Sequence, residues 1–146
     1  MSDPYDLERF VAAQAQAYSR VVAELSDGRK RSHWMWFIFP QIEGLGFSTM
    51  AQRFAIRSRA EAATYLAHGI LGPRLIECTR LVLAVKNRTI HEILGSPDDL
   101  KFRSSMTLFG AVSENPIFGQ AISACYGGAK DQATLEILRS LDGASA

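Results

Sequence analysis

Cysteine is scarce in this sequence and long apolar runs are missing, and each absence excludes a class of protein. Cys78 and Cys125 belong to no CxxC pair and to no His/Cys cluster with zinc-ligand spacing, so we expect two buried thiols. No run approaches the roughly 18 apolar residues of a membrane-spanning helix. The acidic, polar start, MSDPYDLERF, does not have the pattern of a signal peptide. We therefore expect a cytoplasmic protein in a reducing compartment.

The motifs that mark common catalytic and cofactor sites are also absent. There is no GxGxxG, no Walker loop, no HExxH, no Ser-x-x-Lys and no GxSxG elbow. We accordingly expect no metal and no cofactor, and whether the protein is an enzyme stays open. The formal net charge of +1 argues against nucleic acid as a partner and against an electrostatic membrane anchor. The sequence also leaves the oligomeric state open.

The chain does have the composition of one helical domain, with glycine and proline residues at the expected ends of its helices. Its 146 residues, 47% hydrophobic and 21% charged, suit a single globular domain with a sizeable core. Helical periodicity bounded by glycine and proline recurs along the chain, and no segment shows the alternation of a strand. We predict an all-α fold: one compact domain of about seven or eight helices over residues 3–141, followed by a frayed tail at residues 142–146.

Side chains that can cap helix ends support this prediction. Ser58 with Glu61, and Thr89 with Glu92, have the Ser/Thr-x-x-Glu spacing of a capping box. Ser32 is a further N-cap candidate, immediately before a run of apolar residues. These signals predict where three of the helices begin.

The stretch RKRSHWMWFIFPQ, residues 29–41, combines three cations with a run of aromatic residues. About seven residues before its proline are apolar on every side, which fits a short buried helix or a buried strand. We favour the helix, because no other segment offers a strand partner. The structural interpretation is a helix at the centre of the core. In the functional interpretation Trp34 or Trp36 stacks on a base or sugar, while His33 or Gln41 reaches its polar edges and the cations bind phosphate.

The stretch SPDDLKFRSSMTLF, residues 96–109, predicts a helix that carries unexplained polarity. A proline at the first helical position, followed by two acids, is typical of a helix start. The simpler interpretation is a capped surface helix in which Arg103 pairs with Asp99, four residues earlier. The functional interpretation places four polar side chains in a cleft as an anion site: Lys101, Arg103, Ser104 and Ser105. Burying such groups requires partners, which favours the anion site slightly.

Four segments together resemble a known family: RKRSHWMWFIFPQIEGLG, YLAHGILGPRL, SPDDLKFRSSMTLF and NPIFGQAISACYGG. They are similar to the bacterial domain-of-unknown-function family 1810, over about residues 3–138. The resemblance implies a mainly helical single domain and no particular activity, because the family has no established function. Members often carry a calpastatin-like label. This chain does not fit that label, since calpastatin is disordered and this chain has the apolar content of a packed domain.

Three functions stay open at this point. The first is a site that binds, and could process, a phosphate-bearing, nucleotide-like small molecule, with His33 as the acid/base candidate. The segment DDLKFRSSMTLF is also loosely similar to helices of small proteins that process ADP-ribose derivatives, which implies such a ligand. The second is a helical interaction or oligomerisation module without catalysis. The third is binding of RNA or another single strand, which the balanced net charge argues against.

Overall fold

Helices form the regular secondary structure of the computed structural model, which describes residues 2–145. Within these residues there are nine helices and no strand, so the predicted all-α fold is confirmed, with slightly more helices than predicted. The helices are α1 (Glu8–Ser26), α2 (Met35–Ile38), α3 (Thr49–Arg53), α4 (Arg59–Ala67), α5 (Leu71–Ala84), α6 (Ile90–Leu94), α7 (Asp98–Gly110), α8 (Ile117–Tyr126) and α9 (Gln132–Ser145).

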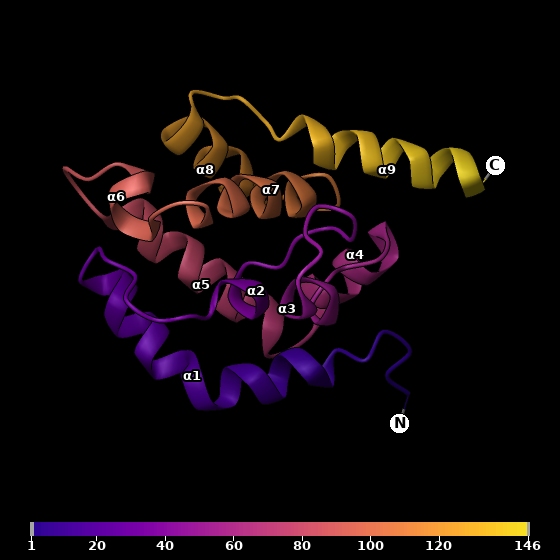
Figure 1. Ribbon diagram of the computed structural model, residues 1–146, viewed down its shortest axis with the longest axis horizontal. Helices are drawn as coiled ribbons and strands as arrows, with labels where there is room; N and C mark the ends of the chain where they lie inside the picture. The colour runs from indigo at the N-terminus through magenta and orange to yellow at the C-terminus, as the bar shows by residue number, and fades with distance from the viewer. Residues whose placement is uncertain (1, 146) are drawn as a thin grey trace.

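Helix α5 lies in the middle of the molecule (Figure 1). It packs against α1 on one side and against α4 and α8 on the others, while the short α2 contacts both α1 and α5. Helix α7 packs against α8, α6 and α4, and α9 lies along its outer side. The domain therefore runs from α1 at one edge to α9 at the opposite edge, with one core between them.

The aromatic stretch predicted as a core helix lies at the centre of that core. Its buried residues are Trp34, Met35, Phe37, Ile38 and Phe39. The ring of Phe39 meets Phe102 of α7 edge-on, with the ring centroids 4.8 Å apart. Helix rather than strand is confirmed for this stretch. Fully burying one such side chain contributes on the order of 2–3 kcal/mol, so this segment is a major source of stability.

Helix boundaries follow the predicted signals where the cap is local. Helix α6 begins at its predicted capping box. Ser32, however, is not an N-cap, because its hydroxyl donates a hydrogen bond to the carboxylate of Glu24 in α1. Helix α9 continues to Ser145, so the predicted frayed tail at residues 142–146 overlaps its last turn. Residue 146 itself lies outside the described residues.

The cysteines are free, and Cys78 is buried whereas Cys125 is half-buried. Burial raises the pKa of the Cys78 thiol to about 12, so it stays protonated. None of the helices in residues 2–145 is long and apolar enough to cross a membrane. Nowhere in that part of the chain do three His, Cys, Asp or Glu side chains gather as metal ligands would.

Candidate functional site

Two hollows adjoin on the face where α7 begins. The α3–α7 hollow, of about 430 Å³, lies between residues 41–51 and α7. Its polar lining residues are Gln41, Ser48, Lys101, Arg103, Ser104 and Asp131. The α2–α7 hollow, of about 380 Å³, lies between residues 30–36 and residues 96–101. Its charged and aromatic lining residues are Lys30, Arg31, His33, Trp36, Asp98 and Lys101. Lys101 therefore lines both hollows.

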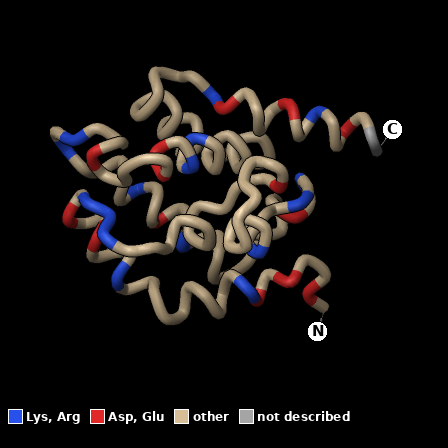
Figure 2. The backbone as a smooth tube through the Cα atoms, viewed as in Figure 1, with Lys and Arg blue, Asp and Glu red and all other residues tan. Residues whose placement is uncertain are grey.

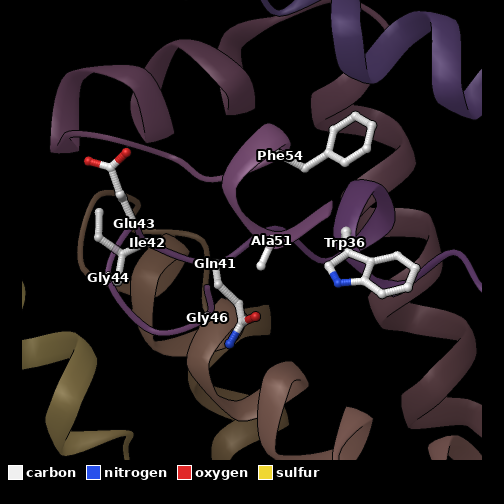
Figure 3. A pocket seen from close by; sticks show the side chains of 8 residues that line it. All are labelled: Trp36, Gln41, Ile42, Glu43, Gly44, Gly46, Ala51 and Phe54. Carbon is white, nitrogen blue, oxygen red and sulfur yellow. The ribbon is translucent and has the colours of Figure 1, made fainter. Parts of the chain in front are cut away.

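A narrow crevice connects the linings of the two hollows (Figure 3). It shares Trp36 with the α2–α7 hollow, and Gln41, Gly46 and Ala51 with the α3–α7 hollow. In this view the Trp36 ring and the Gln41 amide lie on either side of Ala51, whereas the carboxylate of Glu43 points away from both. One edge of the aromatic core stretch is thus accessible from outside.

The two lysines of the α2–α7 hollow share one carboxylate. Lys30 Nζ lies 2.9 Å from Asp98 Oδ2, and Lys101 Nζ lies 3.7 Å from Asp98 Oδ1. Each ammonium group also lies over an indole ring. Lys30 is 5.0 Å from the centroid of Trp34, and Lys101 is 5.1 Å from that of Trp36. These contacts join the two stretches singled out in the sequence into one surface.

A buried carboxylate of α1 fixes the loop that carries His33. Glu24 accepts hydrogen bonds from the backbone N–H groups of Arg31 and Ser32, from the Ser32 hydroxyl and from Nε1 of Trp34. Burial opposes the negative charge on Glu24, but these hydrogen bonds outweigh it and lower the pKa of the carboxyl to about 2. The loop is therefore held by an ionised carboxylate, and His33 is left exposed beside the hollow.

Arg103 lines the α3–α7 hollow without a carboxylate partner among residues 2–145. The predicted pair with Asp99 does not form, because Asp99 Oδ2 lies 3.2 Å from Nδ1 of His91 instead. The Arg103 guanidinium lies over the ring of Tyr126, with its central carbon 5.6 Å from the centroid. Its Nε is buried and has no hydrogen-bond partner in the described part of the chain. A buried donor left in this state costs about 1–3 kcal/mol, and native proteins rarely tolerate it without a reason.

Asp131, the carboxylate of the same hollow, is occupied by its own neighbours. Its Oδ2 accepts hydrogen bonds from the hydroxyl of Ser104, at 3.0 Å, and from the backbone and hydroxyl of Thr134. Asp131 thus caps the start of α9 and ties it to α7. Figure 2 shows the basic residues of α7 following its acidic first turn. In the α3–α7 hollow, Lys101 and Arg103 outnumber this one engaged carboxylate.

A family model for proteins of unknown function (DUF1810) matches residues 4–138 of the chain. The chain belongs to this family. It is also similar to the crystal structure of the conserved hypothetical protein Rv1873 from Mycobacterium tuberculosis. That match has 54% sequence identity and a TM-score of 0.93, and covers 94% of this chain and 99% of that chain. Among curated proteins, none matches. The DUF1810 resemblance predicted from four segments is confirmed, and neither comparison names an activity.

The structure places six of the eight predicted site residues of this DUF1810 protein at the two hollows. They are His33 and Trp36 in the α2–α7 hollow, Gln41, Arg103 and Ser104 in the α3–α7 hollow, and Lys101 in both. His33 and Arg103 therefore face different hollows, with Lys101 between them. The aromatic stretch and α7 do meet at one surface, although they do not form a single enclosed cleft.

Trp34 and Ser105 reach neither hollow, which corrects their predicted ligand-binding roles. Trp34 is 1% exposed and its Nε1 is bound to Glu24, so no ring face is open to a ligand. Ser105 is fully buried in the core. One residue advances a helix by about 100°, which turns Ser105 inward while Ser104 remains at the hollow. The two serines therefore do not line the same hollow, contrary to the prediction that all four polar side chains lie in one cleft.

Two apolar side chains line the α3–α7 hollow that were not predicted from the sequence as site residues. Phe47 is 78% exposed and Leu100 is 51% exposed, and both line the hollow. Leu100 precedes Arg103 and Ser104 by one helical turn, so helical spacing alone could have placed it on their face. For Phe47 the available signal was a large aromatic residue in the glycine-containing loop EGLGFS.

Proposed function

We propose that the α3–α7 hollow binds a phosphate-bearing, nucleotide-like small molecule, and that Arg103 and Lys101 hold its phosphate. The observation that carries this proposal is the state of Arg103. Arg103 lines the hollow, no described carboxylate forms an ion pair with it, and its buried Nε has no hydrogen-bond partner within residues 2–145. A guanidinium matches phosphate oxygens with two parallel N–H groups. Partial burial also reduces screening by water, which strengthens its attraction to an anion.

Lys101 is the second support for the proposal. Asp98 lies closer to Lys30 than to Lys101, at 2.9 Å against 3.7 Å, so Lys101 has the weaker ion pair. A phosphate oxygen can therefore replace Asp98 at the Lys101 ammonium at little cost. Gln41 and Ser104 add polar groups to the same hollow. The volume of about 430 Å³ falls within the range of roughly 300–1,000 Å³ usual for small-molecule sites.

A catalytic role for His33 stays a prediction. His33 lines the α2–α7 hollow and Arg103 lines the other, so only a ligand that extends past Lys101 would reach both. No described residue forms a hydrogen bond with the His33 imidazole, and a catalytic base is normally oriented by such a partner. The proposal is therefore one of binding, and it does not depend on catalysis.

Isothermal titration calorimetry with inorganic phosphate, AMP and ADP-ribose tests the phosphate site. We expect saturable binding of at least one compound to the wild type, and a loss of roughly tenfold or more in Arg103→Gln, because charge-assisted hydrogen bonds are strong. Arg20→Gln is the matched control, since it removes the same charge from the exposed side of α1, outside both hollows. Absence of binding in the wild type, or equal affinities in Arg103→Gln and the wild type, would contradict the proposal.

A helical interaction module is the second candidate function, favoured by the exposed Phe47 and Leu100. A partner chain or a second copy could cover both side chains at once. Light scattering at micromolar concentration tests this: a dimer that Phe47→Ala converts to a monomer would support it. Binding of RNA, the third alternative, would instead show a steep loss of affinity with salt.

A further inference from the structure

We infer that Phe47 stacks on the base of the ligand, so that the α3–α7 hollow selects a nucleoside phosphate over a bare phosphate or a sugar phosphate. This inference rests on the proposed function and names the residue that would give the site its specificity. A stacking residue needs an aromatic ring with a free face beside the phosphate-binding side chains, here Lys101 and Arg103.

The other aromatic rings near these cations are either buried or already in contact with a cation. Trp34 is buried. The Trp36 ring carries the ammonium of Lys101 at 5.1 Å from its centroid, and the Tyr126 ring carries the guanidinium of Arg103 at 5.6 Å. A base stacked in either place would displace a cation that the phosphate requires. A different ring must therefore meet the base.

The backbone of Phe47 is fixed while its ring stays outside the core. Its carbonyl accepts a hydrogen bond of 2.7 Å from Nε2 of Gln52. The next residue, Ser48, caps α3 by accepting a hydrogen bond from the N–H of Ala51. Phe47 thus occupies the position before the N-cap, where an apolar residue usually packs against the fourth residue of the helix. That fourth residue is Gln52, which is polar, so the Phe47 ring has no such partner and is 78% exposed.

The lining of the hollow changes along α7 from apolar to cationic. Leu100 is exposed and lies on the same helical face as Arg103 and Ser104, one turn further on. A ligand with a flat ring at one end and a phosphate at the other matches this change. A bare phosphate would leave Phe47 and Leu100 in water, whereas an apolar peptide would leave the positive charge of Arg103 without an anion. A nucleoside phosphate satisfies both ends.

The decisive comparison is between nucleotides and the same phosphate without a base. Calorimetry would give the affinities of the four nucleoside 5′-monophosphates, ribose 5-phosphate and inorganic phosphate. We expect at least one nucleotide to bind the wild type roughly tenfold more tightly than ribose 5-phosphate, which is a typical effect of stacking on one aromatic side chain. Phe47→Ala should remove this advantage without changing the affinity for ribose 5-phosphate, and Phe47→Trp should keep it.

Ile70→Ala serves as the matched control, because Ile70 is another exposed apolar residue and lines neither hollow. It should leave all affinities unchanged. Since the Phe47 ring is exposed, Phe47→Ala should also keep the thermal midpoint of the wild type.

Each alternative result has a definite meaning. Equal affinity of the wild type for nucleotides and ribose 5-phosphate, or an unchanged preference in Phe47→Ala, overturns the stacking role and leaves the phosphate site intact. Failure of all six compounds to bind overturns the phosphate site and the stacking role together. A changed particle mass in Phe47→Ala, with unchanged nucleotide affinity, overturns stacking and assigns Phe47 to a protein contact.

Discussion

The aromatic stretch at residues 33–41 and helix α7 both carry predicted site residues, yet they differ in how their buried polar atoms are paired. In the aromatic stretch the indole nitrogen of Trp34 reaches Glu24, an ionised carboxylate with several donors around it. In α7, Arg103 Nε and Ser105 Oγ are buried without a partner among the described residues. Because native proteins pair nearly all buried polar groups, an unpaired one needs an explanation. The aromatic stretch is accordingly structural over most of its length, and the unpaired atoms of α7 support the proposal of a ligand there.

Replacing each tryptophan by alanine is the largest test of this comparison. Trp34→Ala should lower the free energy of unfolding by about 3–5 kcal/mol, because it leaves a cavity in the core and removes a donor from Glu24. Trp36→Ala should cost less than half as much, since Trp36 is only partly buried. Urea denaturation of both variants measures the difference. Equal losses would mean that the two rings are equivalent and that Trp36 is also part of the core.

Glu24→Gln should have the next largest effect. The amide keeps the size of the carboxylate but places an NH₂ group against donors such as the Ser32 hydroxyl and Trp34 Nε1. We expect the free energy of unfolding at neutral pH to fall by about 1–3 kcal/mol. Tryptophan fluorescence should report the loosened loop directly. Glu77→Gln, on the exposed side of α5, is the control and should leave stability nearly unchanged.

The same carboxyl predicts how stability depends on pH. The pKa of Glu24 falls from 4.5 to about 2 on folding, so the folded state prefers the ionised form. This contribution, roughly 3 kcal/mol, is fully present above pH 4.5 and is lost as the pH falls through 2. Glu24→Gln should flatten the corresponding part of the stability profile between these two values. An identical acid profile in the wild type and the variant would contradict the assignment.

Local signals in the sequence predicted most of the helices but not the partners of their side chains. Thr89 and Glu92 form both hydrogen bonds of their capping box, because both residues belong to the same helical turn. Ser58 accepts its bond from the N–H of Glu61, yet the Glu61 carboxylate accepts from the N–H of Arg57 rather than from that of Ser58, and its other oxygen lies 2.9 Å from Arg9 of α1. The pairing with a distant arginine is a contact that spacing along the chain cannot show.

The site shows the same division between local and distant information. Lys101, Arg103 and Ser104 follow from helical spacing and unexplained polarity. The polar Gln52, four residues after the N-cap Ser48, was a local signal that Phe47 lacks an apolar partner in α3. That Phe47 lies beside Lys101 and Arg103, however, depends on the packing of distant segments. Asp131 joins the hollow only through the packing of α9 on α7. Burial at the level of single residues, which separates Ser104 from Ser105, also depends on the exact rotation of α7 in the fold.

The two neighbouring serines of α7 give the smallest and sharpest test. Ser104→Ala removes the hydrogen bond to Asp131 and should cost about 1 kcal/mol of unfolding free energy. Ser105→Ala removes a buried hydroxyl that has no described partner, so it should be neutral or stabilise the fold by up to about 1 kcal/mol. Urea denaturation at neutral pH measures the change in unfolding free energy, and its sign, for both variants. If Ser105→Ala destabilised the protein more than Ser104→Ala, the Ser105 hydroxyl would have a partner, such as a buried water. Arg103 Nε would then be the one unpaired buried atom of α7 within residues 2–145, and it alone would have to carry the argument for a ligand.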